Sequence, residues 1–242
     1  MLNSNKKKIF ERIAVISVIT IITVVVLLLM LKYEVEGETN MPFELTKIIV
    51  VSSAEGVEST EDRLNLSLVQ INDIYLQIEK NENVKKENSI KSVIIEKFYI
   101  NEASKIGKGK FYRPSPNARE IFEFNDEYIT NKIEYIGKEQ SNIKELEIGN
   151  QGGIIGIRYS LDELGQYNIQ EQVNHDGTLL NNLNIDINEL YSKISFDIII
   201  ELNSGVKYKS NIVLDVPAGN ILEEGICRQE QTNLEKIVFK RI

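Results

Sequence analysis

An uninterrupted apolar run near the N-terminus constrains the fold of this chain more than any other feature. Ile13–Leu31 contains 19 residues and no charged residue, glycine or proline. At about 1.5 Å rise per residue, a helix over this run is about 28 Å long, close to the roughly 30 Å hydrocarbon core of a bilayer. Its β-branched residues disfavour a helix in water, but in lipid the backbone must satisfy its own hydrogen bonds. The sequence therefore predicts a transmembrane helix over Ile13–Leu31 that contacts the lipid bilayer.

The charges that flank this run predict its orientation. The basic flank on the N-terminal side consists of Lys6, Lys7, Lys8 and Arg12. Positively charged flanks remain cytoplasmic. A cleaved signal peptide would have a shorter apolar segment, of about 7–15 residues, and a small-residue cleavage site, neither of which is found here. We expect residues 1–12 to form a cytoplasmic basic tail and Ile13–Leu31 a retained signal-anchor helix. The chain would be a single-pass plasma-membrane protein whose C-terminal domain is extracytoplasmic.

The exported part is predicted to begin almost at the membrane. Residues 32–43 form a short juxtamembrane linker without a glycine- and serine-rich stalk, so a long reach across a cell wall is not expected. Residues 44–242 form the extracytoplasmic domain. No internal repeat or low-complexity tract divides it, which favours one exported unit; two lobes that meet near Gly137–Asn142 are the alternative.

Alternating and β-branched apolar residues predict that this domain is mainly β. A period of two between apolar and polar residues is typical of half-buried strands. The predicted strands are Leu45–Val51, Leu64–Leu68, Ile74–Ile78, Val93–Ile100, Ile129–Ile136, Ile143–Ile148, Ile154–Tyr159, Ser195–Leu202, Val206–Val216 and Lys236–Ile242. About ten short strands at this spacing indicate a β-sandwich, or a pair of small sandwiches.

Turn signals predict some of the connections between these strands. Asn203–Gly205 makes the tight turn of a hairpin. Ser52–Gly56 would end the first strand. Asn72 and Asp73 would form a turn or bulge, and Gly107–Lys110 a flexible, solvated loop.

Two capping signals predict short helices. Ser115 followed by Pro116 would open a helix through about Phe122, because proline suits the first helical position. Asp186 and Glu189 have the spacing of a capping box, which predicts a helical turn. The expected fold is therefore an N-terminal transmembrane helix followed by an exported β-sandwich domain with one or two short helices.

The formal charge of −8 divides at the membrane. Residues 1–32 carry +4, and residues 33–242 carry −12. The basic end suits the anionic inner leaflet. A nucleic-acid binder needs a basic face that releases counterions from phosphate, so the acidic domain argues against nucleic acid as a partner.

The chain has few residues that could hold a metal or cofactor. With one cysteine and one histidine, it cannot form an intrachain disulfide and has too few Cys and His side chains for a typical zinc or haem site. The carboxylates do not fall at calcium-loop spacing. We therefore predict no metal site and no cofactor-binding residue.

The strongest enzymatic candidates are Cys227, His175, and Arg228 or Arg241. With the signal anchor and a β-rich exported domain, these residue types resemble sortases, and the resemblance implies a thiolate activated by a nearby base or cation. However, Glu223–Ile226 precedes the cysteine where sortases carry Thr-Leu-x-Thr, and carboxylates near a thiol raise its pKa. We predict no catalytic residue and keep a sortase-like transpeptidase or envelope hydrolase as the alternative.

Two further motifs are interpreted as structural. Ser141–Lys144 spells S-x-x-K but lacks the companion motifs of penicillin-binding proteins. Gly149–Gly156 lacks the spacing and the following helix of a dinucleotide fingerprint. Its glycines are predicted to permit a bulge or a positive φ where the chain enters a buried strand.

Several stretches resemble uncharacterised single-pass proteins of Clostridia and related low-GC bacteria. They are Lys32–Gly56, Gly149–Gly153, Phe196–Pro217 and Val238–Ile242. The resemblance implies an anchored, exported protein and assigns no activity. We expect a non-enzymatic binding or structural role in the cell envelope, through an unknown envelope protein partner or through self-association.

Overall fold

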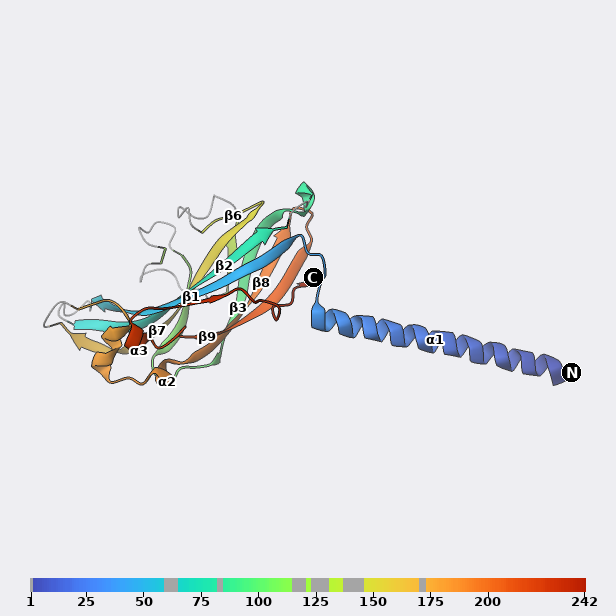
Figure 1. The fold of residues 1–242 in the computed structure, drawn as a ribbon, viewed down its shortest axis with the longest axis horizontal. Coiled ribbons are helices and arrows are strands. Elements are labelled where there is room, and N and C mark those ends of the chain that lie inside the picture. The colour runs from blue at the N-terminus through green and yellow to red at the C-terminus, as the bar shows by residue number, and fades with distance from the viewer. Residues whose placement is uncertain are drawn as a thin grey trace.

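The computed structural model describes residues 2–58, 65–81, 85–114, 121–122, 131–136, 146–169 and 173–242. The long helix α1 (Leu2–Glu36) projects from one end of a β-sandwich, and the C-terminus lies beside the end of this helix (Figure 1). The short helices α2 (Ile187–Leu190) and α3 (Ile221–Glu224) lie toward the far end of the sandwich. The prediction of a mainly β chain with an N-terminal apolar helix is confirmed.

Two antiparallel sheets form the sandwich. The first has the order β10–β1–β2–β7–β4, with β6 also paired to β7, and the second has the order β11–β9–β8–β3–β5. In chain order the strands are β1 (Phe43–Glu58), β2 (Asn65–Lys80), β3 (Ile90–Glu102), β4 (Lys108–Tyr112), β5 (Lys132–Tyr135), β6 (Ile148–Gly149), β7 (Gly152–Asn168), β8 (Ser192–Leu202), β9 (Lys207–Val216), β10 (Cys227–Gln231) and β11 (Lys240–Arg241). The 3₁₀ helices η1 (Lys86–Asn88) and η2 (Gly177–Leu183) complete the described elements.

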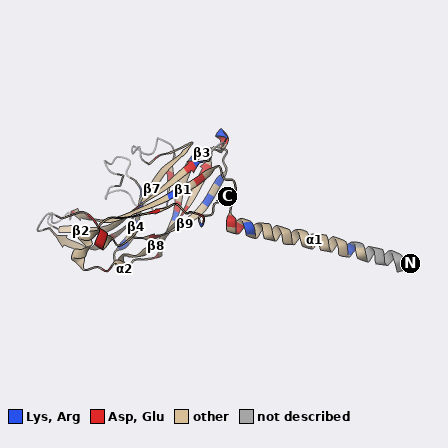
Figure 2. Ribbon diagram, in the orientation of Figure 1, with Lys and Arg blue, Asp and Glu red and all other residues tan. Residues whose placement is uncertain are grey.

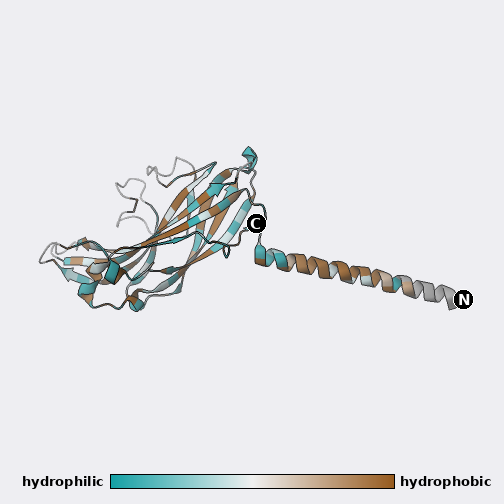
Figure 3. Ribbon diagram, in the orientation of Figure 1, coloured by the Kyte–Doolittle hydropathy of each residue, from teal (hydrophilic) through white to brown (hydrophobic). Residues whose placement is uncertain are grey.

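The predicted alternation sorts the residues of each strand between core and solvent. In β9, Ile212 and Leu214 are buried, whereas Val213 between them is half exposed. Figure 3 shows this alternation along the strands and a continuous apolar band along the middle of α1. Buried side chains from both sheets form one hydrophobic cluster, which also takes in residues of η2, α2 and α3. The described residues therefore share one core rather than two.

Helix α1 extends past the ends predicted for it. It begins by Leu2 and runs to Glu36, so the first five residues of the predicted linker 32–43 are helical and only a short segment separates α1 from β1 at Phe43. Arg12–Glu36 is the one span in the described chain that is long and apolar enough to cross a membrane. None of the side chains in the most apolar part of this span is buried, which is the arrangement expected where lipid supplies the apolar surroundings.

The first two strands are longer than predicted. β1 continues through Ser52–Gly56, and β2 continues through Asn72 and Asp73 without a turn. Polar residues fit inside these strands because their groups are bonded: Ser52 donates to the amide oxygen of Asn72 at 2.7 Å. The strand breaks predicted at Ser52–Gly56 and at Asn72 and Asp73 were wrong, because the strand propensity of single residues does not reveal a hydrogen-bond partner on another strand.

Other boundaries also differ from the prediction. Lys108–Lys110 belongs to β4 and pairs with β7, so it is not a flexible loop. Only Lys240 and Arg241 of the predicted last strand pair as β11. Most of the predicted helix from Ser115, the junction at Gly137–Asn142 and most of the strand Ile143–Ile148 lie outside the described residues. The hairpin of β8 and β9 and the capping box at Asp186 are confirmed.

The outer face of the second sheet is covered by cross-strand ion pairs. Glu201 lies between Lys91 and Lys207, at 2.5 and 3.0 Å, and Asp197 lies 2.7 Å from Lys209. Hydrogen bonds from Lys91 and Lys207 lower the pKa of Glu201. Acidic and basic residues are therefore interspersed on these strands (Figure 2), which is typical of a solvated sheet face.

Candidate functional site

At the end of the sandwich next to α1, the last turn of this helix contacts the C-terminal segment of the chain. The backbone N–H of Arg241 donates to the hydroxyl of Tyr33 at 2.9 Å, and the N–H of Glu38 donates to the carbonyl of Phe239 at 2.8 Å. Lys240 forms an ion pair with Glu34. The last turn of α1 is thus fastened to β11 rather than tethered by a free linker.

Gly37 makes this close junction possible. It ends α1 with φ +70°, a conformation that glycine adopts without strain. A Cβ atom at this position would lie 2.3 Å from Cγ1 of Val238 and 2.5 Å from the carbonyl oxygen of Phe239. Both the helix end and the approach of the C-terminal segment therefore require a glycine.

Three aromatic rings pack beneath the junction. Phe43 at the start of β1 lies edge-on to Phe239 and to Tyr208, with both pairs of ring centroids 5.3 Å apart. Phe43 and Phe239 are buried. Edge-to-face pairs of this kind add to the stabilisation from buried area, so the chain leaving α1 is held on both sheets.

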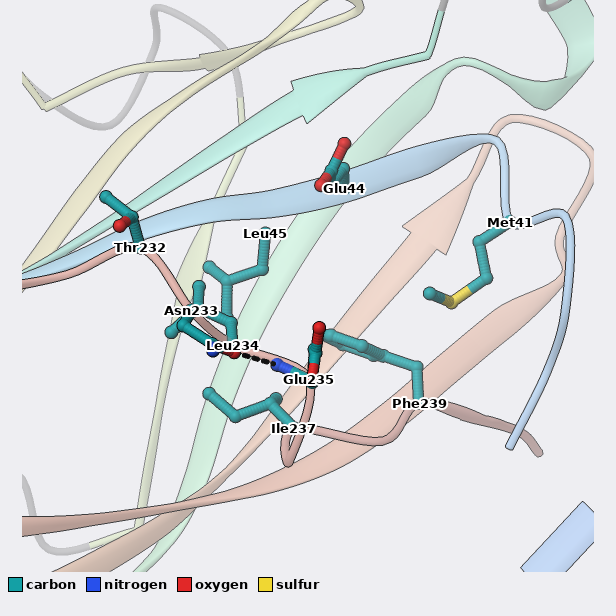
Figure 4. A pocket seen from close by; sticks show the side chains of 9 residues that line it. All are labelled: Met41, Glu44, Leu45, Thr232, Asn233, Leu234, Glu235, Ile237 and Phe239. Atoms are coloured by element: carbon teal, nitrogen blue, oxygen red, sulfur yellow. Dashed lines mark hydrogen bonds between the residues drawn. The ribbon is translucent and has the colours of Figure 1, made fainter. Parts of the chain in front are cut away.

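A groove of about 400 Å³ lies between β1 and the connection from β10 to β11 (Figure 4). Its apolar side chains come from Met41, Leu45, Leu234, Ile237 and Phe239. Its polar side chains come from Glu44, Thr232, Asn233 and Glu235. The lining of this groove therefore mixes apolar and polar side chains.

A second groove, of about 410 Å³, lies on the other side of the same connection. It is lined by charged residues of α1, β8, β9 and the C-terminal segment, among them Glu34, Asp197, Lys209, Lys236 and Lys240. The connection before β11 therefore separates a partly apolar groove from a charged one, and both open at the end that carries α1.

In the structure, Cys227 and His175, the two residues of the sortase-like alternative, do not form a catalytic pair. Cys227 is 4% exposed on β10, with its thiol against Gly219 and Glu224. His175 is exposed, and its Nδ1 accepts a hydrogen bond from the backbone N–H of Gly56 at 3.3 Å. No hydrogen bond links the two side chains. Burial and the neighbouring Glu224 raise the pKa of the Cys227 thiol, which is opposite to what a nucleophilic thiolate needs.

Because of this burial, we expect Cys227 to react with a disulfide reagent at pH 8 roughly 100-fold more slowly in the folded chain than after denaturation. The readout is the absorbance of released thionitrobenzoate. The matched control is Ile226→Cys in a Cys227→Ser background, because Ile226 is 57% exposed and its replacement should react at the rate of a free thiol. Equal rates for the two folded chains would contradict the structure.

The sequence did not point to the polar cluster buried between the sheets. The amide oxygen of Asn72 accepts from both Ser52 and Gln70 at 2.7 Å, and its amide nitrogen donates to the carbonyl of Tyr159 at 3.2 Å. The backbone N–H of Ala218 donates to the Ser52 hydroxyl at 2.8 Å. These bonds fix the register of three strands and the path of the chain after β9, which is a structural role. The alternation of polar residues at 70 and 72 with apolar neighbours was the only available signal.

Of the two motifs interpreted from the sequence as structural, the structure describes one, the glycine-rich stretch. Gly149–Gly156 comprises the end of β6, a turn at Asn150 and Gln151, and the start of β7. Gly152 and Gly153 have φ +102° and +157°, so the predicted positive φ at the entry to a buried strand is confirmed. Ser141–Lys144 lies outside the described residues. Within the part of the chain that the structure describes, no group of three His, Cys, Asp or Glu side chains is placed to hold a metal ion.

These features define a class: a mainly β, sandwich-like protein with one N-terminal helix that could span a membrane. Comparison with known protein families, with curated proteins and with solved structures finds no match to this chain. The case for its function therefore depends on the geometry at the end next to α1.

Proposed function

We propose that this protein is a single-pass membrane-anchored protein that holds its β-sandwich just outside the plasma membrane and has a non-enzymatic binding or structural role there. The observation that carries the proposal is the junction between α1 and β11. An apolar helix without a covering of protein continues into a sandwich that grips its last turn. Such a junction holds the sandwich at the membrane surface.

The charge distribution supports the proposed orientation. Basic residues precede the apolar run and the domain that follows is acidic, so the N-terminus is cytoplasmic and the sandwich extracytoplasmic under the positive-inside rule. The resemblance to single-pass clostridial proteins implies the same arrangement.

The end of the second sheet remote from α1 offers a surface for a protein partner. Tyr99 on β3 and Val213 on β9 lie opposite Ser195 in register, and both side chains are at least half exposed. Tyr191 lies in the same region and donates its hydroxyl to Asp215 at 2.6 Å. Aromatic and apolar side chains with such polar neighbours are enriched at protein interfaces.

We expect a photo-crosslinking residue at Tyr99 to form a covalent adduct with another protein, or with a second copy of the chain, in intact membranes. The control places the same residue at Ile154 on the other sheet, which is 38% exposed and should give little adduct. Gel shifts followed by mass spectrometry identify the products. Recovery of the chain alone from both positions would count against a binding role.

A further inference from the structure

The C-terminal segment, Lys236–Ile242, lies where a membrane would begin if α1 spans it. We propose that this segment is a second membrane contact, in which Lys236 and Arg241 bind the phosphate groups of phospholipids and Ile242 inserts among the headgroups. The inference rests on the proposed function, because it needs α1 in the bilayer. It adds a lipid-binding surface on the sandwich itself.

The depth of the segment follows from its bond to α1. Tyr33 comes two residues after Leu31, the last residue of the apolar run, which is about 3 Å further along the helix. The hydroxyl of Tyr33 accepts a hydrogen bond from the backbone N–H of Arg241 at 2.9 Å. Tyrosine near the end of a transmembrane helix lies at headgroup level. Arg241 is therefore held beside the headgroups by a group that marks their position.

At the end of the sandwich next to α1, two basic side chains form no ion pair with a described residue and can bind an anionic ligand. Three carboxylates at this end already have lysine partners, whereas Glu38 forms no ion pair with any residue that the structure describes. The pairs are Glu34 with Lys240, Glu36 with Lys32, and Asp197 with Lys209. Lys236 and Arg241 are exposed, and neither forms an ion pair with any residue that the structure describes. Guanidinium and ammonium groups are the side chains that bind phosphate oxygens most strongly.

Some apolar side chains of the C-terminal segment are buried or half-buried in the sandwich and one is exposed, which suits a position at the membrane–water interface. Phe239 is buried in the aromatic group beneath the junction, and Ile237 and Val238 are half-buried. Ile242 is 64% exposed, although its backbone N–H is bonded to the carbonyl of Lys207 at 3.0 Å. An ordered, exposed isoleucine next to an arginine at headgroup level can insert into the headgroup region.

The occupant is the headgroup layer of the bilayer that holds α1. A soluble phosphate could reach Lys236 and Arg241 equally well, but it would not account for an exposed isoleucine fixed beside them. The groove that Lys236 and Ile242 help to line also contains Glu34 of α1, so this surface is continuous with the helix.

The absence of tryptophan from the chain provides a direct test. Three full-length variants, Ile242→Trp, Ile226→Trp and Ile22→Trp, are reconstituted in phosphatidylcholine vesicles whose acyl chains carry bromine at a shallow or a deep position. Bromine quenches tryptophan emission only at short range. The Ile242→Trp chain should lose roughly half its emission with shallow bromine, the depth expected for an interfacial contact. The Ile226→Trp chain, with its tryptophan near α3 at the far end (Figure 1), should not be quenched.

The Ile22→Trp chain separates failure of this inference from failure of the anchor. Strong quenching of that chain by deep bromine, with no quenching of the Ile242→Trp chain, would overturn the second contact and leave the anchor intact. No quenching of the Ile22→Trp chain would overturn the anchor and the inference together. Adding Lys236→Glu and Arg241→Glu to the Ile242→Trp chain should reduce its quenching at least twofold; unchanged quenching would exclude phosphate binding by the two cations.

Discussion

Replacement of Gly152 with alanine is expected to destabilise the sandwich by about 3 kcal/mol or more. Gly152 begins β7 at φ +102°, and a Cβ atom there would lie 2.0 Å from the carbonyl oxygen of Ile78 in β2. That oxygen is backbone within a paired strand, so it cannot move aside without breaking part of the ladder. Urea unfolding of the full chain in a mild detergent, followed by near-ultraviolet circular dichroism, measures the loss.

The matched control for Gly152 is Gly205 in the turn between β8 and β9. Gly205 also has a positive φ, of +84°, but a Cβ atom there would meet nothing within 4 Å. Gly205→Ala should therefore cost only the conformational strain, about 1 kcal/mol. The difference between the two variants reports the clash with β2. If the Gly152→Ala and Gly205→Ala variants lose the same free energy of unfolding, the result contradicts the close approach of β7 to β2.

Removal of the carboxylate of Asp73 should destabilise the fold by about 3 kcal/mol, because it leaves a buried guanidinium without its partner. Arg158 is 7% exposed, and its Nε and Nη2 donate to the two carboxylate oxygens at 2.6 and 3.0 Å. Its guanidinium also lies 4.8 Å from the ring centroid of Phe122. Although burial opposes the charge, the bonds and charge of Asp73 raise the pKa of Arg158. The Asp73→Ala chain is compared with wild type by the same urea titration.

Two further variants test whether burial causes this effect. Lys108 and Glu163 are 2.6 Å apart, but both side chains are more than half exposed, so Lys108→Ala should change stability by about 0.5 kcal/mol or less. A double variant, Asp73→Ala with Arg158→Leu, should lose less than Asp73→Ala alone, because no unpaired charge remains. A larger loss in the double variant would show that the packing of the arginine, rather than its charge, stabilises the sheet.

The features that sequence reasoning predicted correctly depend on neighbours in the chain. The apolar run Ile13–Leu31 predicts a helix because each backbone bond closes four residues away. The β8–β9 hairpin follows from alternation around Asn203–Gly205, and the turn at α2 from the capping box of Asp186 and Glu189, whose two hydrogen bonds are both present. Each signal lies within about twenty residues, so it needs no knowledge of the rest of the fold.

The features that sequence reasoning missed depend on residues brought together across the chain. Asp73 was interpreted as a turn residue, yet it lies directly opposite Arg158 in the register of β2 and β7. The C-terminal segment was predicted as an ordinary last strand, yet its role is to hold the end of α1, about 200 positions earlier in the chain. No local pattern encodes which strands become neighbours.

By itself, the sequence determined that this protein has an apolar helix at its N-terminus, a β-rich domain after it, and glycines that admit a positive φ before β7. The tertiary structure alone decided that Asn72 and Asp73 lie within a strand, that Cys227 and His175 are not bonded to each other, and that α1 ends against β11. The physical reason is the range of the interactions. Helix periodicity and turn chemistry act over a few residues, whereas strand register, buried ion pairs and the junction at Tyr33 depend on packing between distant segments.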